Sequence, residues 1–177
     1  SYTKMNKEKV LEILKKYKSS FSKSEQSFVD EIIKNKSINT DDHFELFTDG
    51  ACEFNKEHEP INAGIGGILK NNGRVLSSFS KNIGIKTNNE AEYLALIEGL
   101  HLCQKENIKS ISIFLDSELV VKQVNGDYKV KNERMAVLHK NVLDILKKFR
   151  EFNVAHIYRE NNTEADNLSK EALLNKN

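Results

Sequence analysis

The change of hydrophobic spacing after His43 constrains the fold of this chain more than any other feature of its sequence. Three runs of β-branched and aromatic residues follow, bounded by Gly, Asn and Asp: Phe44 to Thr48, Gly64 to Lys70 and Val75 to Asn82. Asn71-Asn72-Gly73 is a strong turn signal between the second and third runs. The spacing therefore predicts three successive antiparallel strands.

The second half of the chain alternates between helical and extended patterns. We expect a helix from about Asn89 to Lys105, a strand from Ser110 to Leu115, a helix from Ser117 to Val124, a helix from Glu133 to Arg150, a strand from Phe152 to Tyr158 and a helix from Thr163 to Leu174. An antiparallel meander followed by this alternation predicts an α/β protein with a mixed five-stranded sheet flanked by helices.

Residues 1–42 have a different pattern. Apolar residues recur at helical spacing in two short segments, and Ser22 with Glu25 forms a capping-box signature before the second. A polar stretch from Asn35 to Asp42 follows and has the composition of a linker. We expect a small helical hairpin with its linker over residues 1–42 and one main domain over residues 43–177.

Composition narrows the possible functions and locations. The 177 residues carry a formal net charge of only +1, so contacts to nucleic acid would have to come from local lysines and metal ions. The two cysteines, Cys52 and Cys103, form no Cys-x-x-Cys or Cys/His cluster and are too few for a disulfide framework. With no apolar run of membrane-spanning length and no secretory signal pattern, we expect a cytoplasmic protein with free thiols.

Four acidic residues, Asp49, Glu92, Asp116 and Asp166, lie at junctions of the predicted elements. Singly, each has an ordinary explanation: Asn89 with Glu92 reads as a helix N-cap and its box partner, and the others suit turns or helix starts. Together, two strand ends and two helix starts would gather four carboxylates, which repel one another unless cations are bound. Magnesium binds such carboxylates, and two ions can stabilise both oxygens of a phosphodiester displacement. The set predicts two-magnesium hydrolysis, with Mn²⁺ as a substitute.

The acids fall within four ordered motifs: Phe47-Thr48-Asp49-Gly50-Ala51-Cys52, Thr87-Asn88-Asn89-Glu90-Ala91-Glu92, Leu115-Asp116-Ser117 and Asn162-Thr163-Glu164-Ala165-Asp166. In these motifs and their order, residues 44–174 resemble ribonuclease H of the type I family. The resemblance implies the ribonuclease H fold and an endonuclease that cuts the RNA strand of RNA/DNA hybrids, with the four acids as catalytic metal ligands. It also implies that Asn55, Asn88 and Asn89 contact the minor groove of the hybrid and that Thr87 lies beside a DNA phosphate.

Two departures place the chain near the short-loop branch of this family. Tyr158-Arg159-Glu160-Asn161 runs directly into the last motif and offers no loop histidine. Arg159 is a candidate phosphate contact, although an ordinary surface arginine is an equal alternative. The basic protrusion of some relatives is replaced by a short turn whose Tyr128, Lys129 and Lys131 could make a few phosphate contacts.

Two other functions are compatible with the same fold. One is a nuclease that acts on other nucleic acids such as double-stranded RNA, since fold does not fix substrate. The other is a catalytically silent nucleic-acid-binding module, which would gain nothing from clustered, mutually repulsive carboxylates. We therefore expect a monomeric ribonuclease H that binds RNA/DNA hybrid and Mg²⁺ and has no membrane partner.

Overall fold

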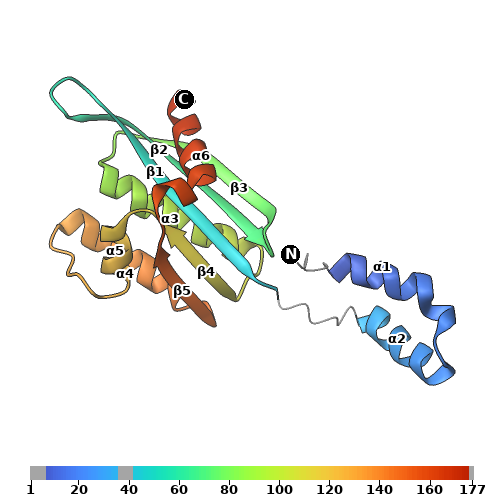
Figure 1. Cartoon of the computed structure of the whole chain (residues 1–177). Helices are drawn as coiled ribbons and strands as arrows, with labels where there is room; N and C mark the ends of the chain where they lie inside the picture. The colour runs from blue at the N-terminus through green and yellow to red at the C-terminus, as the bar shows by residue number, and fades with distance from the viewer. Residues whose placement is uncertain (1–6, 36–41, 176–177) are drawn as a thin grey trace. The chain divides into compact units, whose positions relative to one another are not determined.

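The computed structural model describes residues 7–35 and 42–175. The chain divides into two compact units, residues 1–42 and residues 43–177. The division falls where the hydrophobic spacing of the sequence changes. Figure 1 shows the helices of the first unit and the sheet with its helices in the second.

The first unit contains the predicted helical hairpin. It consists of α1 (Lys7–Tyr17), the 3-10 turn η1 (Lys18–Ser20) and α2 (Lys23–Asn35). The expected capping box is present, because the Ser22 backbone N–H donates to the Glu25 carboxylate at 2.8 Å and the Glu25 N–H donates to the Ser22 hydroxyl at 3.4 Å. An ion pair of 2.5 Å between Lys18 and Asp30 joins the turn to α2.

The second unit is built on a mixed sheet, as the sequence predicts. Within residues 42–175, five strands pair in the order β3-β2-β1-β4-β5. Their bounds are β1 (Phe44–Phe54), β2 (Pro60–Asn71), β3 (Arg74–Gly84), β4 (Ser110–Leu115) and β5 (Glu151–His156). The first three strands are antiparallel, whereas β1 pairs with β4, and β4 with β5, in parallel.

The predicted turn between β2 and β3 has the conformation its sequence favours. Asn72 and Gly73 have φ angles of 50° and 79°, and both lie in the left-handed region that a two-residue hairpin turn requires. Asn71 pairs with Arg74 on either side of it. This turn fixes the register of the edge hairpin.

Several element bounds differ from the sequence prediction. β1 was expected to stop at Thr48, but antiparallel pairing with β2 continues through Asp49 and Gly50 as far as Phe54. The Asp-Gly pair is therefore inside a strand rather than a turn. At the other end, α5 stops at Leu146 instead of Arg150, and β5 covers Glu151–His156 rather than Phe152 to Tyr158.

Helices cover both faces of the sheet. They are α3 (Asn88–Lys105), α4 (Glu118–Val124), α5 (Glu133–Leu146) and α6 (Thr163–Leu174), with the 3-10 turn η2 (Arg159–Asn161) before α6. Residues of β2 alternate between the faces: Ala63 and Ile65 pack in a cluster with Ala91 and Ala95 of α3, while the intervening glycines contact α6. Figure 1 likewise shows α6 and α3 on opposite sides of the sheet.

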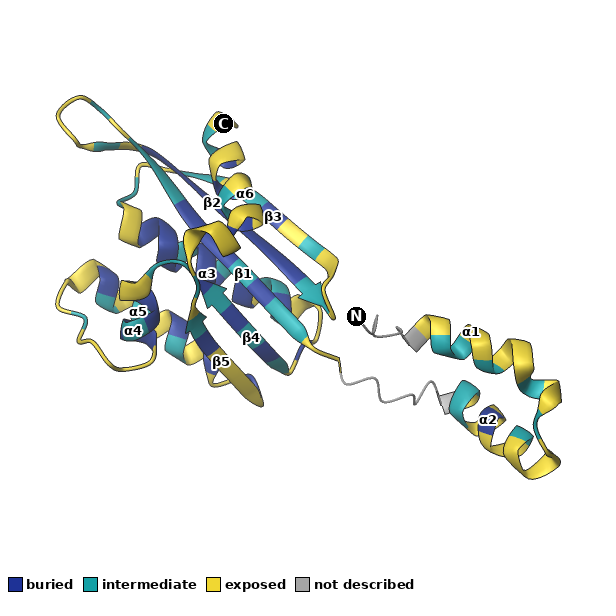
Figure 2. Ribbon diagram, viewed as in Figure 1, coloured by how far each residue is buried: buried dark blue, intermediate teal, exposed yellow. Residues whose placement is uncertain are grey.

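The main core lies on the α3 side of the sheet. It joins buried residues of β1, β4, α3, α4 and α5, among them Leu46, Leu96, Leu100, Ile113 and Val142. Figure 2 shows this buried interior in the strands and in the sheet-facing sides of the helices. In the part of the chain that the structure describes, no helix is both long and apolar enough to cross a membrane.

Candidate metal centre

Three of the four predicted acids come together near the middle of the sheet, where β1 and β4 stop pairing with each other. Asp49 lies on β1, Glu92 lies on α3 and Asp116 directly follows β4. Each offers a carboxylate oxygen, and these oxygens all lie within 4.8 Å of one another. Asp49 and Glu92 are buried, while Asp116 is partly exposed. The cluster is therefore accessible from one side.

The end of one strand pairing creates the space for this cluster. Parallel pairing between β1 and β4 ends at Thr48 opposite Leu115, so Asp49 and Asp116 are the next residue on each strand. The space outside the carboxyl ends of parallel strands is where open α/β sheets bind ligands. Asp49 does not end its strand, as the sequence suggested, but it lies where β1 leaves β4.

A close approach of α3 to β1 brings Glu92 to the same place. A Cβ atom added to Gly50 would lie 2.5 Å from the Ala91 carbonyl carbon and 2.6 Å from the Glu92 nitrogen. Only glycine leaves room for the helix backbone at this position. The Gly50 backbone also forms a hydrogen bond with the Glu92 carboxylate, which favours its charged form.

Asp166 lies beside the cluster without belonging to the group of three. It is in the first turn of α6, partly exposed, and its Oδ2 accepts a hydrogen bond of 2.7 Å from Lys170 one turn later. Its charge nevertheless raises the pKa of Asp49. Asp166 is thus within electrostatic reach of Asp49, with its own carboxylate paired to a lysine.

Burial and mutual repulsion make two of the carboxylates hard to ionise. Burial is the main cause that raises the pKa of Asp49 to about 6, with the charges of Asp116 and Asp166 adding to it and a hydrogen bond from Ser169 opposing it. Burial, followed by the charges of Asp49 and Asp116, raises the pKa of Glu92 well above its usual value. A cation would remove this repulsion.

Unpartnered oxygens support a cation at this position. Among the described residues, Asp49 Oδ1 and Glu92 Oε2 are buried and accept no hydrogen bond. Buried polar atoms are normally satisfied, so exceptions need an explanation. Carboxylate oxygens are the ligands that Mg²⁺, Mn²⁺ and Ca²⁺ prefer. The donor set therefore fits a hard divalent metal ion.

Two polar residues that sequence reasoning did not select support the cluster. Asn162 is 2% exposed, and its side-chain N–H donates to the Thr48 carbonyl at 3.0 Å and to Asp116 Oδ2 at 3.4 Å. Ser169 is fully buried, and its hydroxyl donates to Asp49 Oδ2 at 2.5 Å. Asn162 could have been found from the sequence because it begins the last of the four motifs. The only sequence signal for Ser169 is that it lies three residues after Asp166 and so on the same face of the helix.

The raised pKa of Asp49 predicts how pH affects the metal-free protein. Between about pH 4 and pH 6 the folded chain keeps a proton that the unfolded chain has lost, so stability should fall as pH rises through this window. The loss is on the order of 3 kcal/mol at about 1.4 kcal/mol for each pKa unit. Thermal melting in EDTA from pH 4.5 to 8 measures it. Asp49→Asn should make the dependence less steep, with the contribution of Glu92 remaining, and an equally steep slope in that variant would contradict the assignment.

The predicted residues at the start of α3 lie on the turn that carries Glu92. Thr87, rather than Asn89, is the N-cap: its hydroxyl accepts from the Glu90 N–H at 3.2 Å, and the Glu90 carboxylate accepts from the Thr87 N–H at 2.8 Å. The expected box of Asn89 with Glu92 is wrong, because the N-cap lies two residues before Asn89. Asn88 and Asn89 are both exposed in this first turn, whereas the Glu92 side chain is buried.

Asn55 lies in the loop of the β1–β2 hairpin and organises that loop. Its Oδ1 accepts from the Glu57 and Glu59 backbone N–H groups at 3.0 and 2.8 Å, and its Nδ2 donates to the Glu59 carboxylate at 3.0 Å. This is the pattern of an asparagine that stabilises a turn. Any contact of Asn55 with a substrate would have to share these groups.

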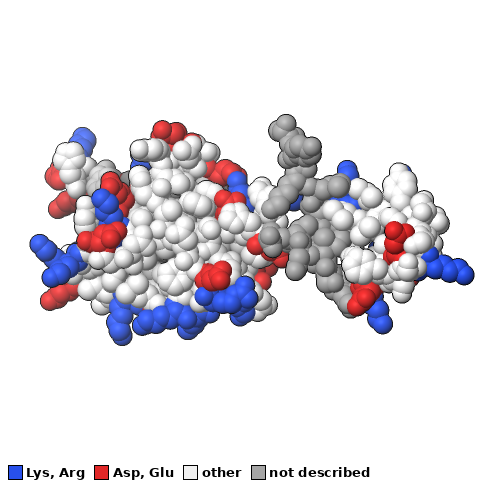
Figure 3. Space-filling model, turned by 60° about the horizontal axis from the view of Figure 1, so that its bottom comes forward, with Lys and Arg blue, Asp and Glu red and all other residues white. Residues whose placement is uncertain are grey.

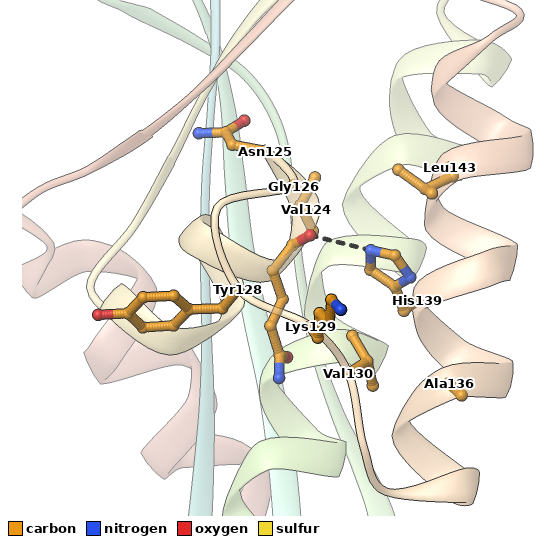
Figure 4. A pocket seen from close by; sticks show the side chains of 10 residues that line it. Val124, Asn125, Gly126, Tyr128, Lys129, Val130, Ala136, His139 and Leu143 are labelled. Carbon is orange, nitrogen blue, oxygen red and sulfur yellow. Dashed lines mark hydrogen bonds between the residues drawn. The ribbon is translucent and has the colours of Figure 1, made fainter.

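The predicted residues of the turn after α4 lie beside a separate pocket. Tyr128 and Lys129 help line a pocket of about 440 Å³ with His139 of α5, whose ring N–H donates to the Gln123 carbonyl at 3.0 Å, as Figure 4 shows. The Tyr128 hydroxyl accepts from Lys122 at 3.2 Å. Tyr128, Lys129 and Lys131 are exposed and therefore accessible to a ligand in solution.

Arg159 is exposed in η2, and its charge lowers the pKa of Asp49. It is therefore near enough to Asp49 to act on that carboxylate electrostatically. On the second unit, the face in Figure 3 has a broad uncharged centre, with lysine and arginine side chains along its lower margin and aspartate and glutamate side chains at other margins.

Comparison with known proteins identifies the fold and the family. Residues 47–172 match the reverse transcriptase-like family. The bifunctional protein Rv2228c of Mycobacterium tuberculosis is 34% identical over 116 residues, which is 64% of this chain and 32% of the relative. Ribonuclease HI of Halobacterium salinarum is 31% identical over 128 residues, or 72% of this chain and 62% of the relative. This chain thus spans about a third of the mycobacterial protein's length.

Solved structures agree with the sequence matches. Ribonuclease H1 of Halobacterium salinarum superimposes with a TM-score of 0.71 at 29% identity, covering 76% of this chain and 99% of that one. LC11-RNase H1, crystallised with an RNA/DNA hybrid, gives a TM-score of 0.68 at 34% identity and covers 73% and 96%. The fold is thus that of ribonuclease H type I proteins, as the sequence motifs predicted. The chain belongs to the reverse transcriptase-like family.

Proposed function

We propose that residues 43–177 form a catalytic domain that hydrolyses the RNA strand of RNA/DNA hybrids, with divalent metal ions held by Asp49, Glu92, Asp116 and Asp166. The observation that carries this proposal is the group of three carboxylates within 4.8 Å, with unpartnered buried oxygens on Asp49 and Glu92. A relative crystallised with an RNA/DNA hybrid supports the choice of substrate. Mg²⁺ is the proposed ion and Mn²⁺ its substitute, because both are oxygen-binding cations.

The four acids have different tasks in this proposal. Bound divalent ions would stabilise the charge on the attacking and leaving oxygens of the phosphodiester. Asp49 and Asp116, which directly follow the last residues paired between β1 and β4, would be the central ligands. Glu92, whose carboxylate is hydrogen-bonded by the Gly50 backbone, would help position the attacking water. Asp166, whose carboxylate is now hydrogen-bonded to Lys170, would help hold the second ion.

The proposed substrate contacts come from exposed or partly exposed residues. Asn88 and Asn89 carry amide groups that can both donate and accept, which suits base edges and 2′-hydroxyls in the wide minor groove of an A-like duplex. Thr87 and Asn55 are proposed contacts to DNA phosphate and minor groove, although both already form intramolecular hydrogen bonds. Tyr128, Lys129 and Lys131 would contact the backbone of a longer duplex.

One assay tests the proposal against its alternatives. Labelled RNA/DNA, RNA/RNA and DNA/DNA duplexes are incubated with Mg²⁺, Mn²⁺ or EDTA and with either the full chain or a 43–177 fragment. We expect both proteins to cut only the RNA of the hybrid, and only with metal. Cleavage of double-stranded RNA would identify a broader nuclease. Binding without cleavage would identify a silent module, and a folded but inactive fragment would assign the hairpin a part in the reaction.

Two further proposals concern the state of the protein. The thiols of Cys52 and Cys103 are unbridged, and burial raises their pKa values to about 11 and 12, so neither is a reactive thiolate. Free thiols of this kind suit a reducing compartment such as the cytoplasm. A monomer is the proposed assembly, because the four acids of the site all come from one chain.

Arg159→Ala should slow hybrid cleavage by roughly 10-fold, the effect of losing one exposed phosphate contact of about 1.4 kcal/mol. The reason for its effect is proximity, since the charge of Arg159 reaches Asp49. Single-turnover cleavage at saturating Mg²⁺ measures the change. Arg150→Ala is the matched control, because Arg150 is also exposed but hydrogen-bonds Ser110 at the opposite end of β4. Equal effects of the two substitutions would remove Arg159 from the site.

A further inference from the structure

Ser169 occupies an unusual position for a serine on a helix. It is fully buried, and its hydroxyl lies 2.5 Å from Asp49 Oδ2 and 2.8 Å from the Asp166 carbonyl oxygen. A serine hydroxyl has one proton to donate, so the two acceptors compete for it. The hydroxyl thus connects the β1 carboxylate to the helix turn that carries Asp166.

Two glycines of β2 make this contact possible. A Cβ atom on Gly66 would lie 2.4 Å from the Ser169 nitrogen, and one on Gly64 would lie 2.4 Å from the Ser169 carbonyl oxygen. The backbone of α6 therefore rests directly on β2 at Ser169. Gly66 is also the residue paired with Asp49 across the β1–β2 ladder. Side chains of paired residues point to the same face, so the Asp49 carboxylate meets the helix at Ser169.

The two acceptors are not equivalent. An ionised carboxylate accepts a shorter and stronger hydrogen bond from a hydroxyl than a peptide carbonyl does, and the Asp49 contact is the shorter of the two. The hydroxyl therefore holds Oδ2 of Asp49, and the other oxygen, Oδ1, is the one that has no partner among the described residues. One side of the carboxylate is fixed while the other remains available to a cation.

We propose that Ser169 is a positioning residue of the metal centre: its hydroxyl fixes the orientation of Asp49 so that Oδ1 faces the cation, and because Ser169 is on α6 this bond holds the helix that carries Asp166 against β1. This inference rests on the proposed function, because it assumes that the acids bind metal. Residues that hydrogen-bond metal ligands orient them, and their loss typically weakens metal affinity 10–100-fold. A serine that only closed a helix turn would have no such effect.

Ser169→Ala tests the proposal with little change in side-chain volume. Mn²⁺ binding, measured by electron paramagnetic resonance without nucleic acid, should weaken about 10-fold. The Mg²⁺ concentration for half-maximal hybrid cleavage should rise by a similar factor, while the rate at saturating Mg²⁺ changes much less. Ser80→Ala is the matched control, because the Ser80 hydroxyl also donates to α6, at 2.7 Å from the Leu168 carbonyl oxygen. It should leave Mn²⁺ affinity unchanged.

Separate outcomes overturn the inference and the function. Mn²⁺ affinity of Ser169→Ala within twofold of the unchanged protein, or an equal loss in Ser80→Ala, would overturn the positioning role even if hybrids are cut normally. Failure of the protein without substitutions to bind Mn²⁺ would also overturn the positioning role of Ser169. If the unchanged protein binds Mn²⁺ and Ser169→Ala weakens that binding, the positioning role holds, and failure to cut any hybrid then counts against the proposed function alone.

Discussion

Asp116→Asn is expected to reduce Mg²⁺-dependent cleavage of an RNA/DNA hybrid by about 10³-fold or more, while leaving the metal-free protein as stable as before or more stable. The loss follows because metal-ion stabilisation of the displacement amounts to several kcal/mol, and each 1.36 kcal/mol of barrier is tenfold in rate. The stability gain follows because the charge of Asp116 raises the pKa values of both Asp49 and Glu92. Removing it relieves that repulsion.

The experiment combines cleavage kinetics, hybrid binding and thermal melting with and without Mg²⁺. Hybrid binding should largely survive, because the exposed candidate contacts Asn88, Asn89 and Lys129 remain. Asp144→Asn is the matched control, since Asp144 is an exposed acid on α5 that pairs only with neighbouring lysines among the interactions described. Asp144→Asn should change neither the cleavage rate nor the melting temperature. Near-normal cleavage by Asp116→Asn would overturn the mechanism.

Part of the candidate site could be predicted from sequence because some of its acids lie next to element junctions. The β4 pattern ends at Leu115, so Asp116 could be placed at a strand end without tertiary information. The helix of Glu92 was likewise evident from its spacing. What the sequence did not reveal was that β1 continues past Asp49, since an Asp-Gly pair is a turn signal locally. Cross-strand pairing with β2 outweighs that local preference.

The supporting residues escaped prediction for a different reason. Ser169 acquires its role only when α6 is placed on β2, and that placement depends on Gly64 and Gly66, which are more than 100 positions away in sequence. The misplaced cap at Asn89 has a local cause, because Thr87 with Glu90 and Asn89 with Glu92 are overlapping signatures. The helix uses the cap formed by Thr87 and Glu90, because the Glu92 side chain is buried in the acid cluster. That burial depends on the tertiary structure and cannot be read from the local sequence.

The second large effect is expected from Gly50→Ala, which should destabilise the protein by about 3 kcal/mol, or roughly 6–12 °C in Tm, and abolish tight metal binding. The added Cβ would lie 2.5 Å from the Ala91 carbonyl carbon and 2.6 Å from the Glu92 nitrogen. These are backbone atoms, so the first turn of α3 would have to move away from β1. Glu92 would move with it, and the three carboxylates would no longer face one ion.

Gly99→Ala separates this effect from the general cost of filling a buried glycine. Its added Cβ would meet side-chain methyl groups of the buried Leu46 and Thr48 at 2.9 Å, so these side chains have to shift, but none of these nearest atoms belongs to the backbone. Alanine is also favoured over glycine inside a helix by about 1 kcal/mol. We therefore expect Gly99→Ala to lie within about 1 kcal/mol of the unchanged protein and to bind Mn²⁺ normally. Thermal melting and Mn²⁺ titration of both variants decide the matter: if Gly50→Ala melts and binds like Gly99→Ala, the close approach of α3 to β1 does not build the metal centre.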